Sequence, residues 1–164
     1  MTQLNNHNVG SLSAAVETPT YDRQAVTPGI VHIGVGGFHR AHQAMYVDAL
    51  MNQGEALDWG IVGVGVMPGD KRMQQALAAQ DYLYTLVVKH PDGEYQPRVI
   101  GSMVNYLFAP EDPEAVIETM ADPAIKIVSL TVTEGGYNFH PVSGEFNLDA
   151  PQVRDDLAHP ERPS

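Results

Sequence analysis

Three closely spaced glycines, Gly34, Gly36 and Gly37, join an apolar segment to a segment with helical spacing. In a turn of this kind the backbone can approach a ligand, and the free N–H groups at the start of the next helix can hold a phosphate. We therefore expect the three glycines, with Phe38 at the helix start, to form a phosphate-binding turn. In the usual GxGxxG pattern the third glycine would fall at His39, so the pattern is atypical.

The residues on both sides of the glycines help to decide whether the turn is a ligand site. A glycine-rich turn between a strand and a helix also occurs without a ligand, and the glycines alone leave that interpretation open. The apolar run Ile30–Val35 and the helix-spaced run after it are the context that a dinucleotide-binding turn requires. We expect Gly37 or Ala41 to supply the close packing of helix on strand that the third glycine usually gives.

Acidic side chains follow two further predicted strands. Asp70 comes after the second strand, where an acid would bind the adenosine ribose, although it lies beyond the usual spacing of roughly 20 residues after the glycines. Asp70 is equally well placed to cap the next helix. Thr133 and Glu134 follow the last predicted strand, at the edge of the sheet where ligands bind, and Glu134 also fits a loop or capping role.

Histidines cluster around the glycine turn at positions 32, 39 and 42. His39 and His42 are three residues apart on a predicted helix, and no cysteine or carboxylate nearby completes a metal-ligand set. We therefore expect no metal site. His39 and Arg40 are expected to support the phosphate turn, and His32 to be a strand histidine with a hydrogen-bonded ring.

The elements that must position these residues alternate between strand and helix, which predicts an α/β fold with a mostly parallel sheet flanked by helices. An antiparallel pair is expected to be inserted into this sheet. The predicted strands are Ile30–Val35, Trp59–Val66, Tyr82–Lys89, Tyr95–Phe108 and the buried strand Ile125–Thr131. The predicted helices run from Phe38 to about Asn52, from Lys71 to about Ala79, and from a start at Asp112-Pro113-Glu114, with Pro113 as the first helical residue, through Ala115 to Met120. We expect residues 1–28 to be a surface extension, 29–157 the domain and 158–164 a polar tail.

Composition narrows the class of protein. The chain has 164 residues, 43% of them hydrophobic, and a formal net charge of −11, which argues against nucleic acid or an anionic membrane as a partner. There are no cysteines, so disulfides and thiolate sites are excluded. The sequence shows neither a signal peptide nor an apolar run long enough to span a membrane, and we expect a cytoplasmic location.

Four blocks of sequence together resemble the mannitol dehydrogenase family, the polyol-specific long-chain dehydrogenases, over about residues 28 to 157. The family includes mannitol 2-dehydrogenase, arabinitol dehydrogenase and the hexuronate reductases. The blocks are Gly34–Gln43, Gly63–Val66 with Asp70, Ala78–Tyr82 and Thr133–Tyr137.

The resemblance implies an N-terminal Rossmann-type domain and hydride transfer between NAD(H) and a secondary alcohol or ketone, without a metal. The substrate would be a polyol or keto-sugar, as in mannitol oxidation to fructose or fructuronate reduction. NAD is favoured, although Lys71 and Arg72 beside Asp70 keep NADP possible. The family's catalytic lysine and its partners lie in a later, mostly helical domain, so we expect no catalytic residue here and a segment that is inactive alone.

The resemblance leaves the oligomeric state and the individual substrate open. Because no catalytic residue is expected in this segment, a second interpretation is a non-catalytic module that senses a dinucleotide or binds a partner.

Overall fold

The computed structural model describes residues 3–12, 14–132 and 134–162. The chain forms two compact units, Met1–Thr131 and Val132–Ser164, and each is described by itself.

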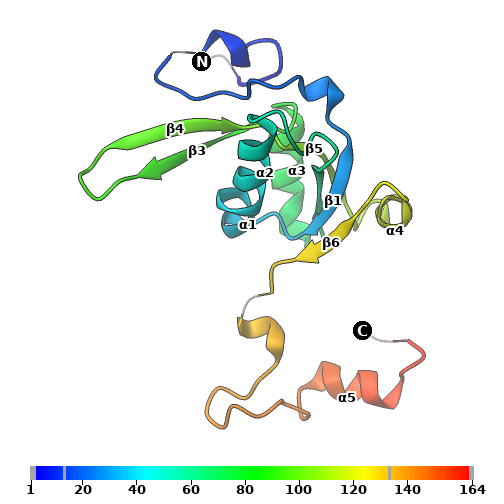
Figure 1. Cartoon of the computed structure of the whole chain (residues 1–164). Coiled ribbons are helices and arrows are strands. Elements are labelled where there is room, and N and C mark those ends of the chain that lie inside the picture. Colours follow the sequence, from blue (N-terminus) through cyan, green and yellow to red (C-terminus); the bar gives the residue numbers. More distant parts are fainter. Residues whose placement is uncertain (1–2, 13, 133, 163–164) are drawn as a thin grey trace. The chain divides into compact units, whose positions relative to one another are not determined.

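A four-stranded parallel sheet forms the centre of the first unit (Figure 1). Its strands are β1 (Pro28–Ile33), β2 (Gly60–Gly65), β5 (Met103–Phe108) and β6 (Ile127–Leu130), in the order β5-β2-β1-β6. After β1 the chain adds strands first on one side and then, with β6, on the other. The sheet therefore has a topological switch point between β1 and β6, and in open α/β sheets ligands bind at the carboxyl ends of the strands there.

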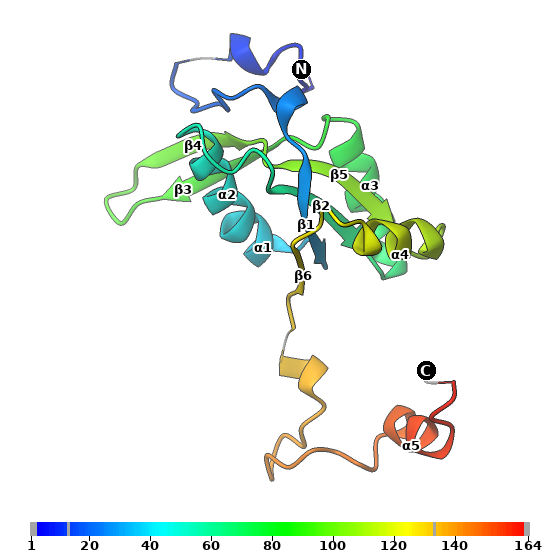
Figure 2. The ribbon, with the colours of Figure 1, turned by 45° about the vertical axis from the view of Figure 1, so that its right-hand side comes forward.

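Helices cover both faces of this sheet (Figure 2). On one face lie α2 (Gln43–Met51) and α3 (Lys71–Ala78), which bury Ala44 and Leu77 in a core with Ile30 and Ile61. On the other face α4 (Pro113–Ala121) buries Val116 against Val31, Val62 and Val64. The continuous burial along β1 and β2 is that of strands covered on both faces.

The antiparallel pair is present as a hairpin of β3 (Tyr84–Lys89) and β4 (Tyr95–Ile100), which extends away from the helices in Figure 1. The predicted antiparallel pair is thus confirmed, and it forms a two-stranded sheet of its own. The predicted strand Tyr95–Phe108 is also two strands, β4 and β5. The chain turns between them at Gly101, where a Cβ atom would lie 2.9 Å from Tyr21 Oη and 3.0 Å from Arg23 Cδ.

The long helix predicted after the glycines is divided at His42 into α1 (Gly37–Ala41) and α2. The backbone of His42 has φ −122° and ψ −84°, outside the helical region, and its ring Nδ1 lies 2.8 Å from the carbonyl oxygen of Phe38. The ring thus lies against the same carbonyl that accepts the backbone N–H of His42 at 3.1 Å.

The strand predicted as buried at Ile125–Thr131 is the edge strand β6, and that part of the prediction is wrong. Ile127, Val128 and Leu130 are exposed, Leu130 to 59%. In the described part of the chain, β6 pairs only with β1, so its other edge and much of both its faces remain open.

Shorter elements complete the two units. The first unit begins with two 3₁₀ turns, Val9–Ser11 and Arg23–Ala25, and has a third at Pro68–Asp70. The second unit holds a 3₁₀ turn at Glu134–Tyr137 and α5 (Pro151–Ala158), a helix that the sequence pattern did not predict. None of the helices in the described ranges is long and apolar enough to cross a membrane.

A buried carboxylate ties the first unit together at the carboxyl end of α2. Asp48 is fully buried and accepts hydrogen bonds from Tyr21 Oη at 2.7 Å and from the Gly101 N–H at 2.8 Å. It also pairs with Arg98 of β4 at 3.2 Å. One side chain therefore joins the N-terminal segment, the hairpin and the sheet.

Replacing Asp48 with alanine is expected to lower the free energy of unfolding by about 3 to 5 kcal/mol, because a buried cation and several donors lose their acceptor. Asp58→Ala is the matched control. Asp58 is exposed and pairs with Lys126, so its loss is expected to change stability by less than about 1 kcal/mol. Urea denaturation of both variants measures the difference, and equal effects would contradict a special role for Asp48.

Candidate functional site

The glycine turn leaves the sheet at the carboxyl end of β1, beside the switch point. Gly34 has a positive φ of 84°, which glycine adopts without strain, and its N–H donates to the Val64 carbonyl of β2 at 2.9 Å. The N–H of Gly36 then donates to the Gly34 carbonyl at 2.8 Å. These two bonds turn the chain sharply out of β1 and into α1.

The three glycines of the turn border open space. A Cβ atom added at Gly34, Gly36 or Gly37 would meet no heavy atom within 4 Å. The N–H groups of Gly37, Phe38 and His39 donate to no acceptor in the described ranges. The turn therefore presents bare backbone and free donors, which together are suited to an anionic group. Gly37 does not pack closely on a strand. The expectation that Gly37 supplies the close packing that the third glycine usually gives is therefore wrong.

His39 occupies the place of the missing glycine and packs α1 onto the sheet. Its side chain is 2% exposed, and its ring stacks on that of His32 in β1, with centroids 3.7 Å apart and an interplanar angle of 11°. His32 Nδ1 lies 2.9 Å from Ser129 Oγ and its Nε2 lies 3.2 Å from Thr131 Oγ1. The expectation that His32 has a hydrogen-bonded ring is confirmed.

The buried histidine pair is neutral at ordinary pH. Burial, with smaller contributions from the neighbouring His32 and Arg40, lowers the pKa of His39 to about 4, against an opposing effect of Gln43. Burial also lowers the pKa of His32. Neither ring nitrogen of His39 has a hydrogen-bond partner in the described residues.

Arg40 and Phe38, the neighbours of His39 in α1, are less buried than His39 and make different contacts. Arg40 Nε donates to the Gly36 carbonyl at 3.3 Å, and its guanidinium carbon lies 5.9 Å from the centre of the Tyr84 ring. Tyr84 Oη donates in turn to the Arg40 carbonyl at 2.7 Å. Phe38 is 67% exposed and stacks on His42. Arg40 thus stabilises the turn through its hydrogen bond to the Gly36 carbonyl, while Phe38 faces solvent.

Two glycines of β2 belong to the site and were not predicted as site residues. A Cβ at Gly63 would lie 2.6 Å from Val35 Cγ2, and one at Gly65 would lie 2.5 Å from Tyr106 Oη and 2.6 Å from Asp70 Cβ. Their lack of side chains lets the turn and Asp70 lie against the sheet. The alternation of glycines within an apolar strand is the signal that indicates such close approach.

Asp70 lies beyond the carboxyl end of β2, in the 3₁₀ turn before α3. Its Oδ2 accepts from the N–H groups of Val66 at 3.0 Å and Met67 at 2.9 Å. It makes no side-chain bond to α3, so the interpretation of Asp70 as a side-chain cap of that helix is wrong. Within the described ranges its Oδ1 has no hydrogen-bond partner, so this oxygen is free to accept from a ligand.

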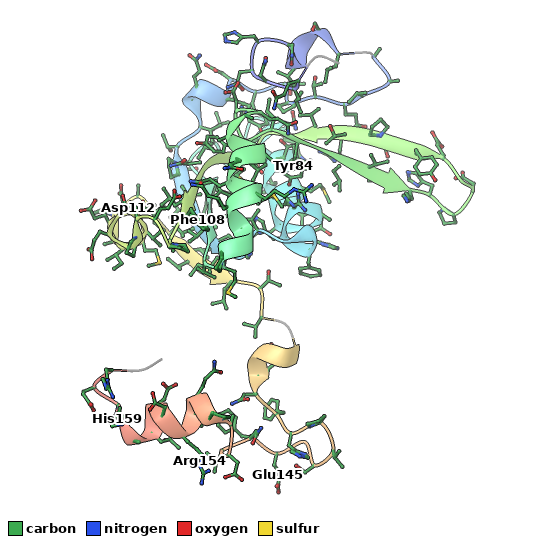
Figure 3. All side chains as sticks on the ribbon, turned by 180° about the vertical axis from the view of Figure 1, so that it is seen from behind. Tyr84, Phe108, Asp112, Glu145, Arg154 and His159 are labelled. Atoms are coloured by element: carbon green, nitrogen blue, oxygen red, sulfur yellow. The ribbon has the colours of Figure 1, made fainter. Side chains whose placement is uncertain are left out.

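Lys71 lies at the same edge of the sheet, and it is not free. Its ammonium pairs with Glu111 and lies 5.2 Å from the ring centre of Phe108, which Figure 3 labels. The other two lysines are elsewhere. Lys89 is on the hairpin, and Lys126 pairs with Asp58 at the start of β6. Of the three lysines, Lys71 is therefore the one that lies at this edge.

The remaining predicted positions follow β6. Thr133 lies outside the described residues, and Glu134 begins a 3₁₀ turn of the second unit, so their assignment to the site stays a prediction. In the described part of the chain, no group of three or more His, Asp or Glu side chains is arranged to hold a metal ion.

A parallel sheet with a switch point, a glycine turn with free donors and an acid after the second strand define a Rossmann-type domain of the dinucleotide-binding class. Comparison with known families agrees. The family described as the mannitol dehydrogenase Rossmann domain matches residues 28–162, and the chain belongs to this family.

Individual relatives are similar over almost the whole chain. Mannitol 2-dehydrogenase of Cereibacter sphaeroides is 54% identical over 93% of this chain and 32% of its own length. The polyol:NADP oxidoreductase of Gluconobacter oxydans is 47% identical over 98% of this chain and 33% of its own. The Pseudomonas fluorescens mannitol 2-dehydrogenase ternary complex with NAD and D-mannitol superimposes with a TM-score of 0.85, at 49% identity over 99% of this chain and 33% of that one. The chain thus spans about a third of each relative.

The pKa of His39 leads to a prediction about stability. Between pH 6.5 and about 4 the unfolded chain binds a proton at His39 that the folded chain does not, so the free energy of unfolding falls as the pH falls through this window. We expect wild type to lose about 2 kcal/mol more than His39→Phe between pH 7 and pH 4.5. Because carboxylates titrate in both proteins, the difference between the two denaturation curves is the measurement. A difference that does not vary with pH would contradict the prediction.

Proposed function

We propose that this chain is the dinucleotide-binding portion of an NAD-dependent polyol dehydrogenase. The observation that supports this most strongly is the turn at Gly34–Gly37 at the switch point of the sheet, whose backbone is bare and whose N–H groups have no acceptor in the part of the chain that the structure describes. The pyrophosphate would contact this turn, and the adenosine ribose would reach Asp70. The relatives that match are named dehydrogenases and an oxidoreductase, which favours an enzyme over a non-catalytic binding module.

NAD is the favoured cofactor because of the charges around Asp70. A free carboxylate oxygen accepts from ribose hydroxyls and repels a 2′-phosphate. Lys71 is neutralised by Glu111, which weakens the attraction for that phosphate. Arg72 is exposed and has no ion pair within the described ranges, and one relative is named for NADP, so NADP is the alternative cofactor.

The proposed substrate is a polyol such as D-mannitol, with fructose as the ketone, because mannitol 2-dehydrogenases are prominent among the relatives. When bound, the dinucleotide supplies or accepts the hydride. The residues described here would bind and orient it. The proton donor for the forming alkoxide is expected outside this chain, and no metal is expected to take part. We expect the protein to act in the cytoplasm.

Gly36→Val tests the cofactor assignment. The φ of Gly36 is −79° and its Cβ position is open, so the variant is expected to fold with unchanged thermal stability. The new side chain would occupy the space proposed for the pyrophosphate, and the NADH affinity is expected to fall at least about tenfold. Gly10→Val is the control, because its Cβ position is also open but lies in the N-terminal segment. NADH fluorescence titration of the whole protein decides, and unchanged binding by Gly36→Val would overturn the proposal.

Asp70→Asn tests the cofactor preference. The amide oxygen can still accept from Val66 and Met67, so the loop is expected to keep its shape while the negative charge is lost. The ratio of NADPH to NADH affinity is expected to rise by about tenfold. Asp92→Asn, in the turn of the hairpin, controls for a general change in net charge. Titration of each variant with both cofactors measures the ratio, and equal ratios in wild type and Asp70→Asn would contradict this role.

A further inference from the structure

Two buried histidines connect the glycine turn with the edge strand β6. The ring of His39 in α1 lies against that of His32 in β1, and both nitrogens of His32 lie within 3.2 Å of hydroxyl oxygens, those of Ser129 and Thr131. Ser129 is in β6 and Thr131 follows it. An unbroken series of contacts therefore runs from α1 through β1 to the end of β6.

The two ends of this series lie next to two different loops. His39 is in the first turn of α1, directly after the glycines. Thr131 is the first residue after Leu130, which pairs in parallel register with Ile33 at the end of β1. Both loops therefore leave the same edge of the sheet, on the two sides of the switch point, where a bound dinucleotide would extend from one to the other.

The histidine ring at position 39 has no role as a direct ligand. Its side chain is almost fully buried, and neither nitrogen has a hydrogen-bond partner in the described part of the chain. What the side chain contributes is a flat surface that packs on His32. Since the third glycine of the usual pattern allows close packing of helix on strand, this stack performs the same task by a different contact.

We propose that His32 and His39 are a positioning pair that couples the pyrophosphate-binding turn to Thr131 at the end of β6, on the side of the switch point where the nicotinamide half of the cofactor would lie. The stack fixes α1 on β1, and the hydroxyl contacts of His32 fix the end of β6 relative to α1. This inference depends on the proposed function, because it concerns how the same dinucleotide is held.

The two contacts can be separated by variants and by ligands. His32→Phe keeps a ring that can stack on His39 but loses both hydroxyl contacts, whereas His39→Ala removes the stack and His39→Phe restores a flat ring. NADH probes the whole site, and ADP-ribose, which lacks only the nicotinamide ring, probes the site without that ring. Both are titrated against the whole protein, and thermal denaturation is followed in parallel.

We expect His32→Phe to weaken NADH by about fivefold to tenfold while ADP-ribose binding stays within about twofold of wild type. His39→Ala is expected to weaken both ligands by about tenfold, and His39→Phe to restore both. His90→Phe, in the exposed turn of the hairpin, is the matched control and is expected to change neither affinity. If the pair had a purely structural role, the variants would lower thermal stability but would change the NADH and ADP-ribose affinities by the same factor.

The outcomes distinguish the inference from the proposed function. If wild type binds neither NADH nor ADP-ribose, the proposed function fails. If wild type binds both, and His32→Phe weakens both equally or neither, the positioning pair is refuted while the cofactor assignment stands. If His39→Ala does not fold, the ligand comparison for His32→Phe, whose stack is retained, still decides.

Discussion

The constraint on which the site depends is the absence of side chains where β1 and β2 end. Gly34 and Gly36 leave the turn open toward solvent, and Gly63 and Gly65 let Val35, Tyr106 and Asp70 lie directly against β2. A side chain at either β2 glycine would collide with these neighbours. The turn and the acid are thus brought to one edge of the sheet because the strands beneath them carry almost no bulk there.

The chain binds its parts together with buried polar groups as well as with apolar packing. Asp48 gathers donors from three segments, and His32 connects β1 to β6 through Ser129 and Thr131. Such groups stabilise only when their partners are present, because a buried polar atom without a partner is unfavourable. They therefore specify how the segments lie relative to one another more sharply than the aliphatic core does.

The electrostatics of the site differ from those of the whole chain. The formal net charge is −11, yet the turn offers an anion three backbone N–H groups that have no acceptor among the described residues. Hydrogen-bond donors at such short range act locally, whereas the distant carboxylates are screened by salt. Asp70 adds a negative charge at the other end of the site. Local donors of this kind can bind an anion even on a chain whose net charge is negative.

The sequence by itself determined the order of elements, the glycine turn and the residues that form it. The period of the apolar residues and the position of the glycines carry that information locally. The location of Asp70 after β2 was equally visible, because it depends only on chain order. The start of α4 was also predictable, since Asp112, which Figure 3 labels, caps it and Pro113 is its first residue.

Only the tertiary structure decided which partners these residues have. The stack of His39 on His32, the contact of Asp70 with Val66 and Met67, and the pairing of Lys71 with Glu111 depend on backbone directions that no local pattern encodes. The exposure of β6 and the separation of the hairpin from the parallel sheet also depend on which strands become neighbours. Chain order and apolar period specify what each segment is, whereas burial and hydrogen bonding between distant segments specify what it contacts.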